Sequence, residues 1–297
     1  MTILVTGANG FVGQYLVKLL VDATEYNIIA TGIGSSRLPL SNVRLQYHSL
    51  DITNGVAATE FYLKCKPDAV IHAAALTKPD YCELNKTRCW DANVTATRFL
   101  LDAVKKTNCY CIYLSTDFVF DGQKGMYIET DTTEPVNYYG SSKLAAEKAV
   151  IESGINFAIA RTCLVYGNAL QGSRSNIITW VKENLLQGKK IKVVNDQLRT
   201  PTYAEDFAKG ILLMLEKKAN GIFHISGEET MTPYDMAIAT ADYLQLDKTL
   251  IEKVDASVFT EPATRPLKTG FKIDKAKTIL GYKPVSFSEG LNKMLSN

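Results

Sequence analysis

The first 161 residues alternate between short apolar runs and longer segments in which apolar residues recur at helical spacing. The short runs cover residues 2–6, 27–31, 43–47, 69–75, 110–115 and 156–161, and the helical patterns cover residues 11–21, 56–64, 87–106 and 139–152. Strands that are apolar throughout are typical of a parallel sheet covered on both faces. The alternation therefore predicts an α/β fold, a Rossmann-type doubly wound parallel sheet.

Beyond residue 161 the pattern is less regular. It predicts a helix over 176–187 that ends before Gly188, an apolar helix over 203–217, a strand over 222–225, and small helices and loops from Thr232 onward. No repeat or low-complexity linker separates two halves. We therefore expect two interleaved parts: a Rossmann domain of residues 1–161, its sheet completed by parts of 191–226, and a smaller C-terminal substrate lobe formed by 162–190 and 227–297.

The composition is that of an ordinary globular protein, with 46% hydrophobic and 22% charged residues. A net charge of +2 gives no electrostatic basis for binding nucleic acid or an anionic membrane. No apolar run approaches the ~18 residues that span a bilayer. The first predicted strand begins at Thr2 and leaves no room for a signal peptide, so we expect a cytoplasmic protein.

The cysteines and histidines do not form a recognisable metal site. No CxxC pair occurs, and the histidines are scattered, so we expect reduced cysteines, structural histidines and no bound metal. The residues concerned are Cys65, Cys82, Cys89, Cys109, Cys111, Cys163, His48, His72 and His224.

A glycine-rich turn joins the first strand to the first helix. Its glycines stand at positions 7, 10 and 13: Gly7 permits a tight turn, Gly10 a close backbone approach to a pyrophosphate, and Gly13 close packing of helix on sheet. The N–H groups at the helix start can bind phosphate. The turn therefore predicts a dinucleotide site that includes Gly7, Asn9, Gly10, Phe11, Val12 and Gly13.

The end of the second strand indicates which dinucleotide binds. NAD enzymes usually carry an acidic residue there, about 20 residues past the glycines, but residues 31–37 contain none. Ser35, Ser36 and Arg37 suit a 2′-phosphate instead, which favours NADP (NADPH). An ordinary polar loop, with NAD as cofactor, stays open. Further contacts are expected with the adenine and adenosine from Asp51, Ile52, Ala73, Ala74 and Ala75.

A YxxxK motif supplies the candidate chemistry. Tyr139 and Lys143 share one face of a predicted helix, and the nearby cation is expected to lower the phenol pKa from about 10. A reductase needs such a group to protonate the developing alkoxide. The strand before it ends in Thr116, whose hydroxyl can hold a carbonyl oxygen. The neighbouring Tyr138 is not the expected proton donor, because the residue four positions after it is a serine and supplies no cation.

At these residues the chain resembles the extended short-chain dehydrogenase/reductases, and within them the dTDP-4-dehydrorhamnose reductase family. The similar stretches are ILVTGANGFVG, AALTKPDYCE, STDFVFDG, YGSSKLAAEKAV, ARTCLVYG, DQLRTPTYAEDFA and Arg265-Pro266. They extend over essentially the whole chain. The resemblance implies NADPH-dependent reduction of a nucleotide-activated 4-keto sugar by direct hydride transfer, with Thr116, Tyr139 and Lys143 as the catalytic triad.

The resemblance also implies further site residues. Asn93 supports a relay to water beside the cofactor, where Tyr139 and Lys143 also lie. For Gln197, Arg199 and Arg265, the alternative is an ordinary solvated position at the surface. The implied substrate contacts are Thr77, Thr116, Asp117, Phe118, Gln197, Arg199 and Arg265.

The chain departs from the family at positions that border the implied pocket. Phe118 and Leu76 stand where members often carry tyrosine, and RPLKTGF near the end differs from many members. The sugar is therefore left open. Sugar 4,6-dehydratases use an Asp-Glu pair where this chain has Asp117-Phe118, and phenylalanine cannot donate a proton, so dehydration is disfavoured.

Three alternatives stay open. A nucleotide-sugar epimerase would use the same triad with retained NAD. A non-catalytic regulatory subunit, like that of methionine adenosyltransferase, is similar in sequence and would bind the cofactor without turnover, although the intact Tyr139/Lys143 pair argues against it. A reductase of an unrelated ketone is the third. The resemblance also leaves a homodimer open.

Overall fold

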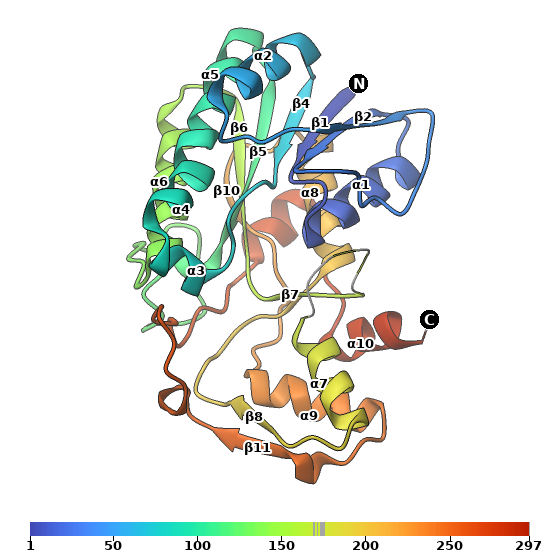
Figure 1. The fold of residues 1–297 in the computed structure, drawn as a ribbon, viewed down its shortest axis with the longest axis vertical. Helices are drawn as coiled ribbons and strands as arrows, with labels where there is room; N and C mark the ends of the chain where they lie inside the picture. The colour runs from blue at the N-terminus through green and yellow to red at the C-terminus, as the bar shows by residue number, and fades with distance from the viewer. Residues whose placement is uncertain (169, 171, 173–175, 297) are drawn as a thin grey trace.

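The computed structural model describes residues 1–168, 170, 172 and 176–296, and its centre is a seven-stranded sheet with the order β10-β6-β5-β4-β1-β2-β3 (Figure 1). All its strand pairs are parallel. The predicted α/β Rossmann-type class is confirmed. The strands are β1 (Thr2–Thr6), β2 (Asn27–Gly32), β3 (Leu45–Ser49), β4 (Ala69–His72), β5 (Tyr110–Thr116), β6 (Phe157–Thr162) and β10 (Gly221–His224).

Helices cover both faces of this sheet, as the apolar strands require. In β1, Ile3 and Val5 lie in one hydrophobic core, while Leu4 between them lies in the other. The first core packs under α1 (Phe11–Ala23) and α8 (Ala204–Glu216), and the second under α2 (Gly55–Cys65) and α5 (Ala96–Thr107). On the same side as α5, α6 (Tyr138–Glu152) covers β5 and β6.

The prediction of one continuous helix over 87–106 is wrong, because the segment is divided. The segment divides into α4 (Lys86–Trp90), a π-helical turn η1 (Asp91–Thr95) and α5. The Thr97 hydroxyl donates to the Asn93 carbonyl at 2.7 Å within the distorted stretch. A π turn inserts an extra residue without changing the apolar spacing much, so the sequence pattern alone reads as continuous helix. Two short elements flank the site, α3 (Pro79–Leu84) and η2 (Asp117–Val119).

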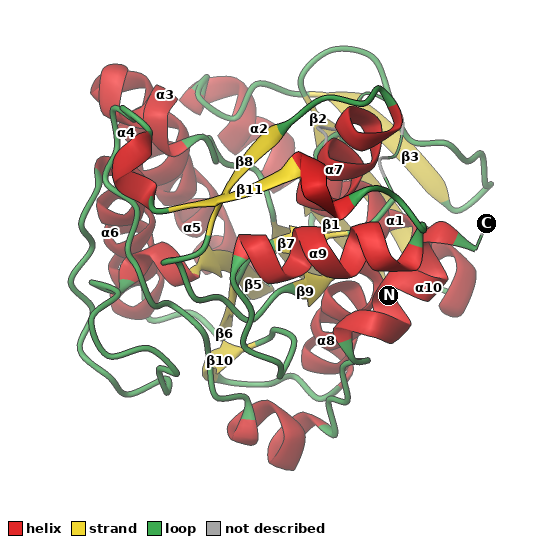
Figure 2. Cartoon of the chain, turned by 90° about the horizontal axis from the view of Figure 1, so that it is seen from below, coloured by secondary structure: helices red, strands yellow, loops and turns green. Residues whose placement is uncertain are grey.

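Apart from η5 (Ala276–Leu280), which packs beside α8 in the first core, the remaining elements form a smaller lobe beyond the carboxyl ends of the strands (Figures 1 and 2). Two short parallel pairs occur there, β7 with β9 and β8 with β11. The sequence predicted neither β8 nor β11, whose four residues give too little pattern. Of the region 191–226, β10 joins the central sheet and β8 does not; the division into two interleaved parts stays a prediction. The elements are β7 (Val165–Tyr166), α7 (Ile177–Leu186), β8 (Ile191–Val194), β9 (Thr202–Tyr203), α9 (Pro233–Tyr243), η3 (Lys248–Leu250), β11 (Ile251–Val254), η4 (Ala256–Val258), η5 (Ala276–Leu280) and α10 (Phe287–Leu295).

Three properties bear on what the protein can bind. No helix in the described part of the chain is long and apolar enough to cross a membrane. All six cysteines are free thiols. Among residues 1–168, 170, 172 and 176–296, no three His, Cys, Asp or Glu side chains gather as a metal site would require.

Candidate active site

The glycine turn between β1 and α1 is a cradle that side chains would fill. Gly7 has φ +69°, and a Cβ there would lie 2.6 Å from the Ala74 backbone nitrogen. A Cβ on Gly13 would lie 2.2 Å from the Gly7 carbonyl oxygen, and one on Gly10 would lie 3.1 Å from it. The first turn of α1 has no acidic residue and no side-chain cap. The backbone N–H groups at this helix start therefore fit a dinucleotide pyrophosphate.

Asn9 connects this turn to the loop that follows β2. Its Oδ1 accepts from the Arg37 backbone N–H at 2.8 Å. Its Nδ2 donates to the carbonyls of Ile33 and Ser35 at 3.1 and 3.0 Å, and to the Tyr47 hydroxyl at 2.7 Å. The sequence marked Asn9 as a cofactor contact but did not reveal that it holds the neighbouring loop, and it missed Tyr47. Asn9 thus fixes two expected phosphate sites relative to each other.

The residues expected at the 2′-phosphate lie at the surface beside this turn. Ser35, Ser36 and Arg37 are exposed, and no carboxylate lies within residues 31–37. The Arg37 guanidinium donates to the Gly172 carbonyl at 3.2 Å. Because all three side chains lie at the surface, their hydroxyl and guanidinium groups fit a phosphate.

The adenosine side of the predicted site is mixed. Asp51 is exposed and its Oδ1 accepts from the N–H and the hydroxyl of Thr53, whereas Ile52 is buried in the core. The segment Ala73 to Ala75 follows β4 directly, and the Ala74 N–H donates to the Thr6 hydroxyl at 3.2 Å. These alanines thus lie beside the glycine turn, as expected of residues that border a cofactor.

A buried histidine, not predicted as part of the site, holds the strand ends together. His72 Nδ1 lies 2.7 Å from the Thr6 hydroxyl, and its Nε2 lies 3.1 Å from the Thr97 hydroxyl. Burial lowers the pKa of His72 to about 3, so the ring is neutral at physiological pH. His72 therefore acts structurally, linking β1 and β4 to α5.

Asn93, on the π turn, is buried behind the site. Its Oδ1 accepts from the Leu76 N–H at 2.7 Å, and its Nδ2 donates to the Leu76 carbonyl at 3.0 Å and to the Ser142 hydroxyl at 2.9 Å. These bonds tie the loop after β4, which carries exposed Thr77, to α6. The relay to water that the resemblance implies stays a prediction.

The expected triad is brought together where β5 ends and α6 begins. Thr116, Tyr139 and Lys143 are all buried, and the Thr116 side chain lies near enough to the phenol to act on the pKa of Tyr139. Asn137 caps α6, its Oδ1 accepting from the Gly140 N–H at 2.8 Å. That cap starts the helix at Tyr138 and fixes where the phenol projects.

The charge states of the triad differ from expectation. Burial raises the pKa of Tyr139, and burial lowers the pKa of Lys143 to about 7. The Lys143 ammonium donates to the Leu114 carbonyl at 2.6 Å and lies 4.1 Å from the ring centroid of Tyr113. The expectation that Lys143 lowers the phenol pKa is therefore wrong for this arrangement, because desolvation dominates. The phenol keeps its proton at neutral pH, as a proton donor must.

Two thiols that sequence reasoning left out lie behind the phenol. Cys82 and Cys89 are fully buried and pack in one cluster with Tyr139, bordered by Leu76 and Phe118. The Phe118 ring lies edge-on to the Tyr139 ring, with centroids 5.9 Å apart. The departures from the family pattern at positions 76 and 118 therefore adjoin the candidate proton donor.

The charged residues predicted to contact substrate are bonded to the protein itself. Arg265 forms a two-pronged ion pair with Asp80, at 2.9 and 2.7 Å, which lowers the pKa of Asp80. Asp117 and Arg199 are buried with 3.8 Å between Oδ2 and Nε, and Gln197 accepts from Arg199 at 3.2 Å. Their contacts with a substrate stay predictions.

Comparison with known proteins identifies the relatives of this chain. The model of the RmlD substrate binding domain matches residues 1–297. The chain is 30% identical, over 98% of its length and 97% of theirs, to a dTDP-4-dehydrorhamnose reductase of Aggregatibacter actinomycetemcomitans. It is 28% identical to methionine adenosyltransferase 2 subunit beta of Rattus norvegicus, over 99% of this chain and 86% of that protein.

Among solved structures, a dTDP-4-dehydrorhamnose reductase from Bacillus anthracis in complex with NADP superposes with a TM-score of 0.85 at 25% identity, covering 99% of this chain and 98% of that one. The full-length match to the domain model and the 30% identical relative together establish the relationship. The chain belongs to the RmlD substrate binding domain family, and its predicted resemblance to the dTDP-4-dehydrorhamnose reductases is confirmed.

Proposed function

We propose that this protein is an NADP-dependent oxidoreductase that reduces the ketone of a nucleotide-activated 4-keto sugar. The observation that carries the proposal is the placement of buried Tyr139 and Lys143 on α6, beside Thr116 at the end of β5, in a chain whose β1–α1 turn fits a dinucleotide. The 30% identical reductase supports the substrate class, and the NADP-bound neighbour supports the cofactor.

Different segments of the chain bind different parts of NADPH. The backbone of Gly7 to Gly13 receives the pyrophosphate at the start of α1. The exposed Ser35, Ser36 and Arg37 receive the 2′-phosphate, in a loop positioned by Asn9. NADPH supplies the hydride that the ketone carbon accepts.

Tyr139 is the proton donor. Its raised pKa keeps the phenol protonated until the carbonyl oxygen gains negative charge, and the phenol then donates its proton to that oxygen. Lys143 lies on α6, one turn after Tyr139, and its side chain donates to the Leu114 carbonyl of β5. When it is protonated, it supplies positive charge beside the site. Phe118 excludes water from one side of the phenol and has no proton to offer, which disfavours dehydration.

Two rivals make different demands. An epimerase would retain NAD, whereas the loop after β2 offers an arginine and serines and no acid. A regulatory subunit would need no proton donor; the relative named methionine adenosyltransferase 2 subunit beta keeps this reading open. The presence of Tyr139 and Lys143 on α6 with Thr116 at the end of β5 favours catalysis, because a regulatory subunit does not need this set of groups.

The test follows NADPH and NADH absorbance with purified protein and dTDP-4-keto-6-deoxy-L-mannose, followed by other nucleotide-linked keto sugars. The proposal predicts consumption of NADPH in preference to NADH. Tightly retained NAD with sugar interconversion would support the epimerase. Binding of NADPH without turnover across the sugars would support the regulatory subunit and contradict the proposal.

A further inference from the structure

Asn137 stands directly before α6, two residues ahead of Tyr139, and it is buried. Its Oδ1 accepts from the Gly140 N–H at 2.8 Å and so closes the first turn of the helix. Its Nδ2 donates to the carbonyl of Thr264, 127 residues further along the chain, also at 2.8 Å. One side chain therefore bonds both to the helix that carries the expected proton donor and to the C-terminal segment.

The first turn of α6 depends on this cap. Gly140 is buried, and a Cβ on it would lie 2.1 Å from the Phe118 carbonyl oxygen, so the helix backbone packs directly on η2. Because of this burial, the cap rather than water accepts from the Gly140 N–H. Helix ends fray where their first N–H groups lack acceptors. Tyr139 lies in this turn, so without the cap the phenol would move relative to Thr116 and Phe118.

Two carboxylates of α3 support the same junction. Glu83 Oε2 accepts from the Tyr138 N–H at 2.9 Å, at the start of α6. Three residues earlier, Asp80 accepts from the Ala263 N–H at 3.2 Å and forms the ion pair with Arg265. The short helix α3 thus holds the start of α6 and the C-terminal segment next to each other, and the amide of the cap joins them directly.

We propose that Asn137 is a positioning residue with two tasks: its Oδ1 aligns the phenol of Tyr139, and its Nδ2 holds the segment 263–265, which carries Arg265. The inference rests on the proposed function, in which Tyr139 donates the proton, and on the predicted contact of Arg265 with the sugar. Rotation of the amide by half a turn would place its NH2 group against the Gly140 N–H, so the network fixes which atom serves which task.

Asn137→Ser and Asn137→Ala separate the two bonds. Serine keeps an oxygen that caps a helix but is too short to reach Thr264, whereas alanine loses both bonds. We expect the KM for the sugar to rise about two- to tenfold in both variants, through loss of the bond to Thr264. Only Asn137→Ala should lower kcat, by about 3- to 30-fold relative to Asn137→Ser, with the Kd for NADPH within about twofold in both.

A residue that only stabilised the fold would not give this pattern. Loss of folded protein lowers the apparent kcat without changing KM, and counting NADPH-binding sites by titration corrects for it. Recovery of kcat in Asn137→Ser therefore identifies the cap as the cause, and the shared rise in KM identifies the bond to Thr264. Equal kcat values in Asn137→Ser and Asn137→Ala, or a wild-type KM in Asn137→Ser, would overturn the inference.

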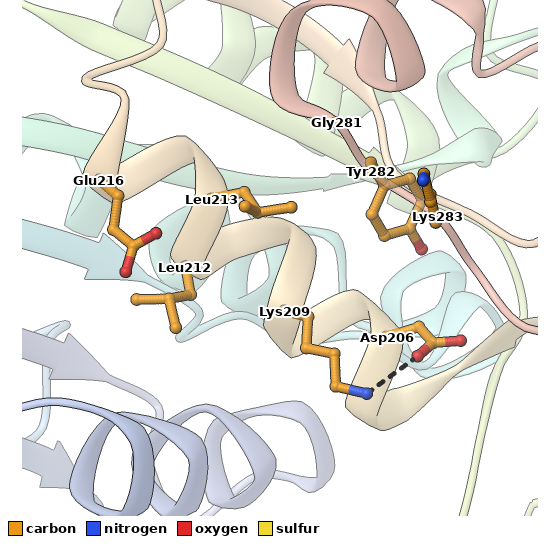
Figure 3. Close-up of a pocket in the computed structure, with 8 residues that line it drawn as sticks. All are labelled: Asp206, Lys209, Leu212, Leu213, Glu216, Gly281, Tyr282 and Lys283. Atoms are coloured by element: carbon orange, nitrogen blue, oxygen red, sulfur yellow. Dashed lines mark hydrogen bonds and ion pairs between the residues drawn. The ribbon is translucent and has the colours of Figure 1, made fainter.

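Asp206→Asn is the matched control, because Asp206 is also a buried polar side chain at a helix start that holds a distant backbone group. Its Oδ2 accepts from the Val285 N–H at 2.8 Å, and its Oδ1 lies 3.5 Å from Lys209 Nζ (Figure 3). The cavity of about 300 Å³ that it lines shares no residue with the candidate site. Loss of the negative charge in the first turn of α8 should lower thermal stability and leave kcat and KM at their wild-type values. Changes in kcat and KM as large as those of Asn137→Ala would contradict the inference.

The outcomes separate the two proposals. A wild-type protein that binds NADPH and reduces none of the keto sugars contradicts the proposed function and this inference together. An active wild type whose Asn137→Ser and Asn137→Ala variants keep the wild-type kcat and KM contradicts the inference alone.

Discussion

The glycine turn and the lobe contact around Arg199 are both candidate binding regions, yet they are built in opposite ways. At the turn, residues 7–13 present backbone, and the side chains expected to bind phosphate, such as Arg37, are exposed. At the lobe contact, Asp117 and Arg199 are buried and their polar atoms are bonded within the chain. A charged residue in a family motif therefore has two possible roles, and burial with a full set of partners distinguishes them.

The two regions also differ in the substitutions that they tolerate. The turn depends on the absence of side-chain atoms, so any added Cβ disturbs it. The lobe contact depends on the presence of particular polar atoms, so removing one leaves another unpaired. Substitutions in the two regions should thus separate into losses of cofactor affinity and losses of sugar-dependent turnover.

The largest effect is expected at the turn. Gly7→Ala places a Cβ 2.6 Å from the Ala74 nitrogen at φ +69°. Strain of about 2–3 kcal/mol would displace the turn and weaken NADPH binding about 100-fold, as measured by fluorescence titration. Gly154→Ala is the control, since Gly154 has φ +72° and open space around its Cβ. Equal NADPH affinity in both variants would show that the turn is not the cofactor site.

Arg37→Ala should change cofactor preference. Loss of a charge-assisted bond to the 2′-phosphate would weaken NADPH binding about 10- to 100-fold, while NADH binding changes within about twofold. The measurement is the ratio of kcat/KM for the two cofactors. An equal fall in kcat/KM for NADPH and NADH would show that Arg37 does not determine cofactor selectivity.

Asp80→Asn should have a smaller effect, on the lobe side. Its partner Arg265 holds the C-terminal segment near α3, but the pair is partly exposed and contributes about 0.2–1 kcal/mol. We expect the KM for the sugar to rise about two- to fivefold with kcat retained, because a loosened segment costs ordering energy on binding. A fall in kcat with constant KM would instead place Asp80 in the proton-donor network.

Lys143→Met should change the pH dependence of stability. Burial lowers the pKa of Lys143 from 10.5 to about 7 in the folded chain, so between these values the unfolded chain binds more protons. Stability contributed by this group therefore rises with pH across that window. The variant should have a higher Tm than wild type below pH 7, and the gap should close toward pH 10.5. A constant gap would mean that Lys143 titrates normally.

Local patterns predicted much of the molecule because their causes are local. Strand and helix positions follow from apolar spacing, and the glycine turn follows from where a Cβ cannot fit. The strand predicted over 43–47 lies at Leu45–Ser49 in the structure, because an edge strand has a weaker apolar pattern. The confirmed fold and family rest on these signals.

Features that depend on distant partners escaped the sequence. Asn9 organises a loop 24 to 28 residues away, and Asp117 meets Thr269 across 152 residues. Burial of Tyr139 between β5 and α6 raises the pKa of its phenol, opposite to the effect expected from Lys143. No spacing rule encodes such contacts, because they form only when segments distant in the sequence are packed together.

The central claim is that Tyr139 is the proton donor for reduction of a keto sugar by NADPH. Its most direct test compares wild type and Tyr139→Phe, measuring NADPH consumption with the keto sugar and NADPH affinity in parallel. The account predicts a fall in kcat of about 100-fold or more with unchanged NADPH affinity. A Tyr139→Phe variant that turns over at the wild-type rate would contradict it.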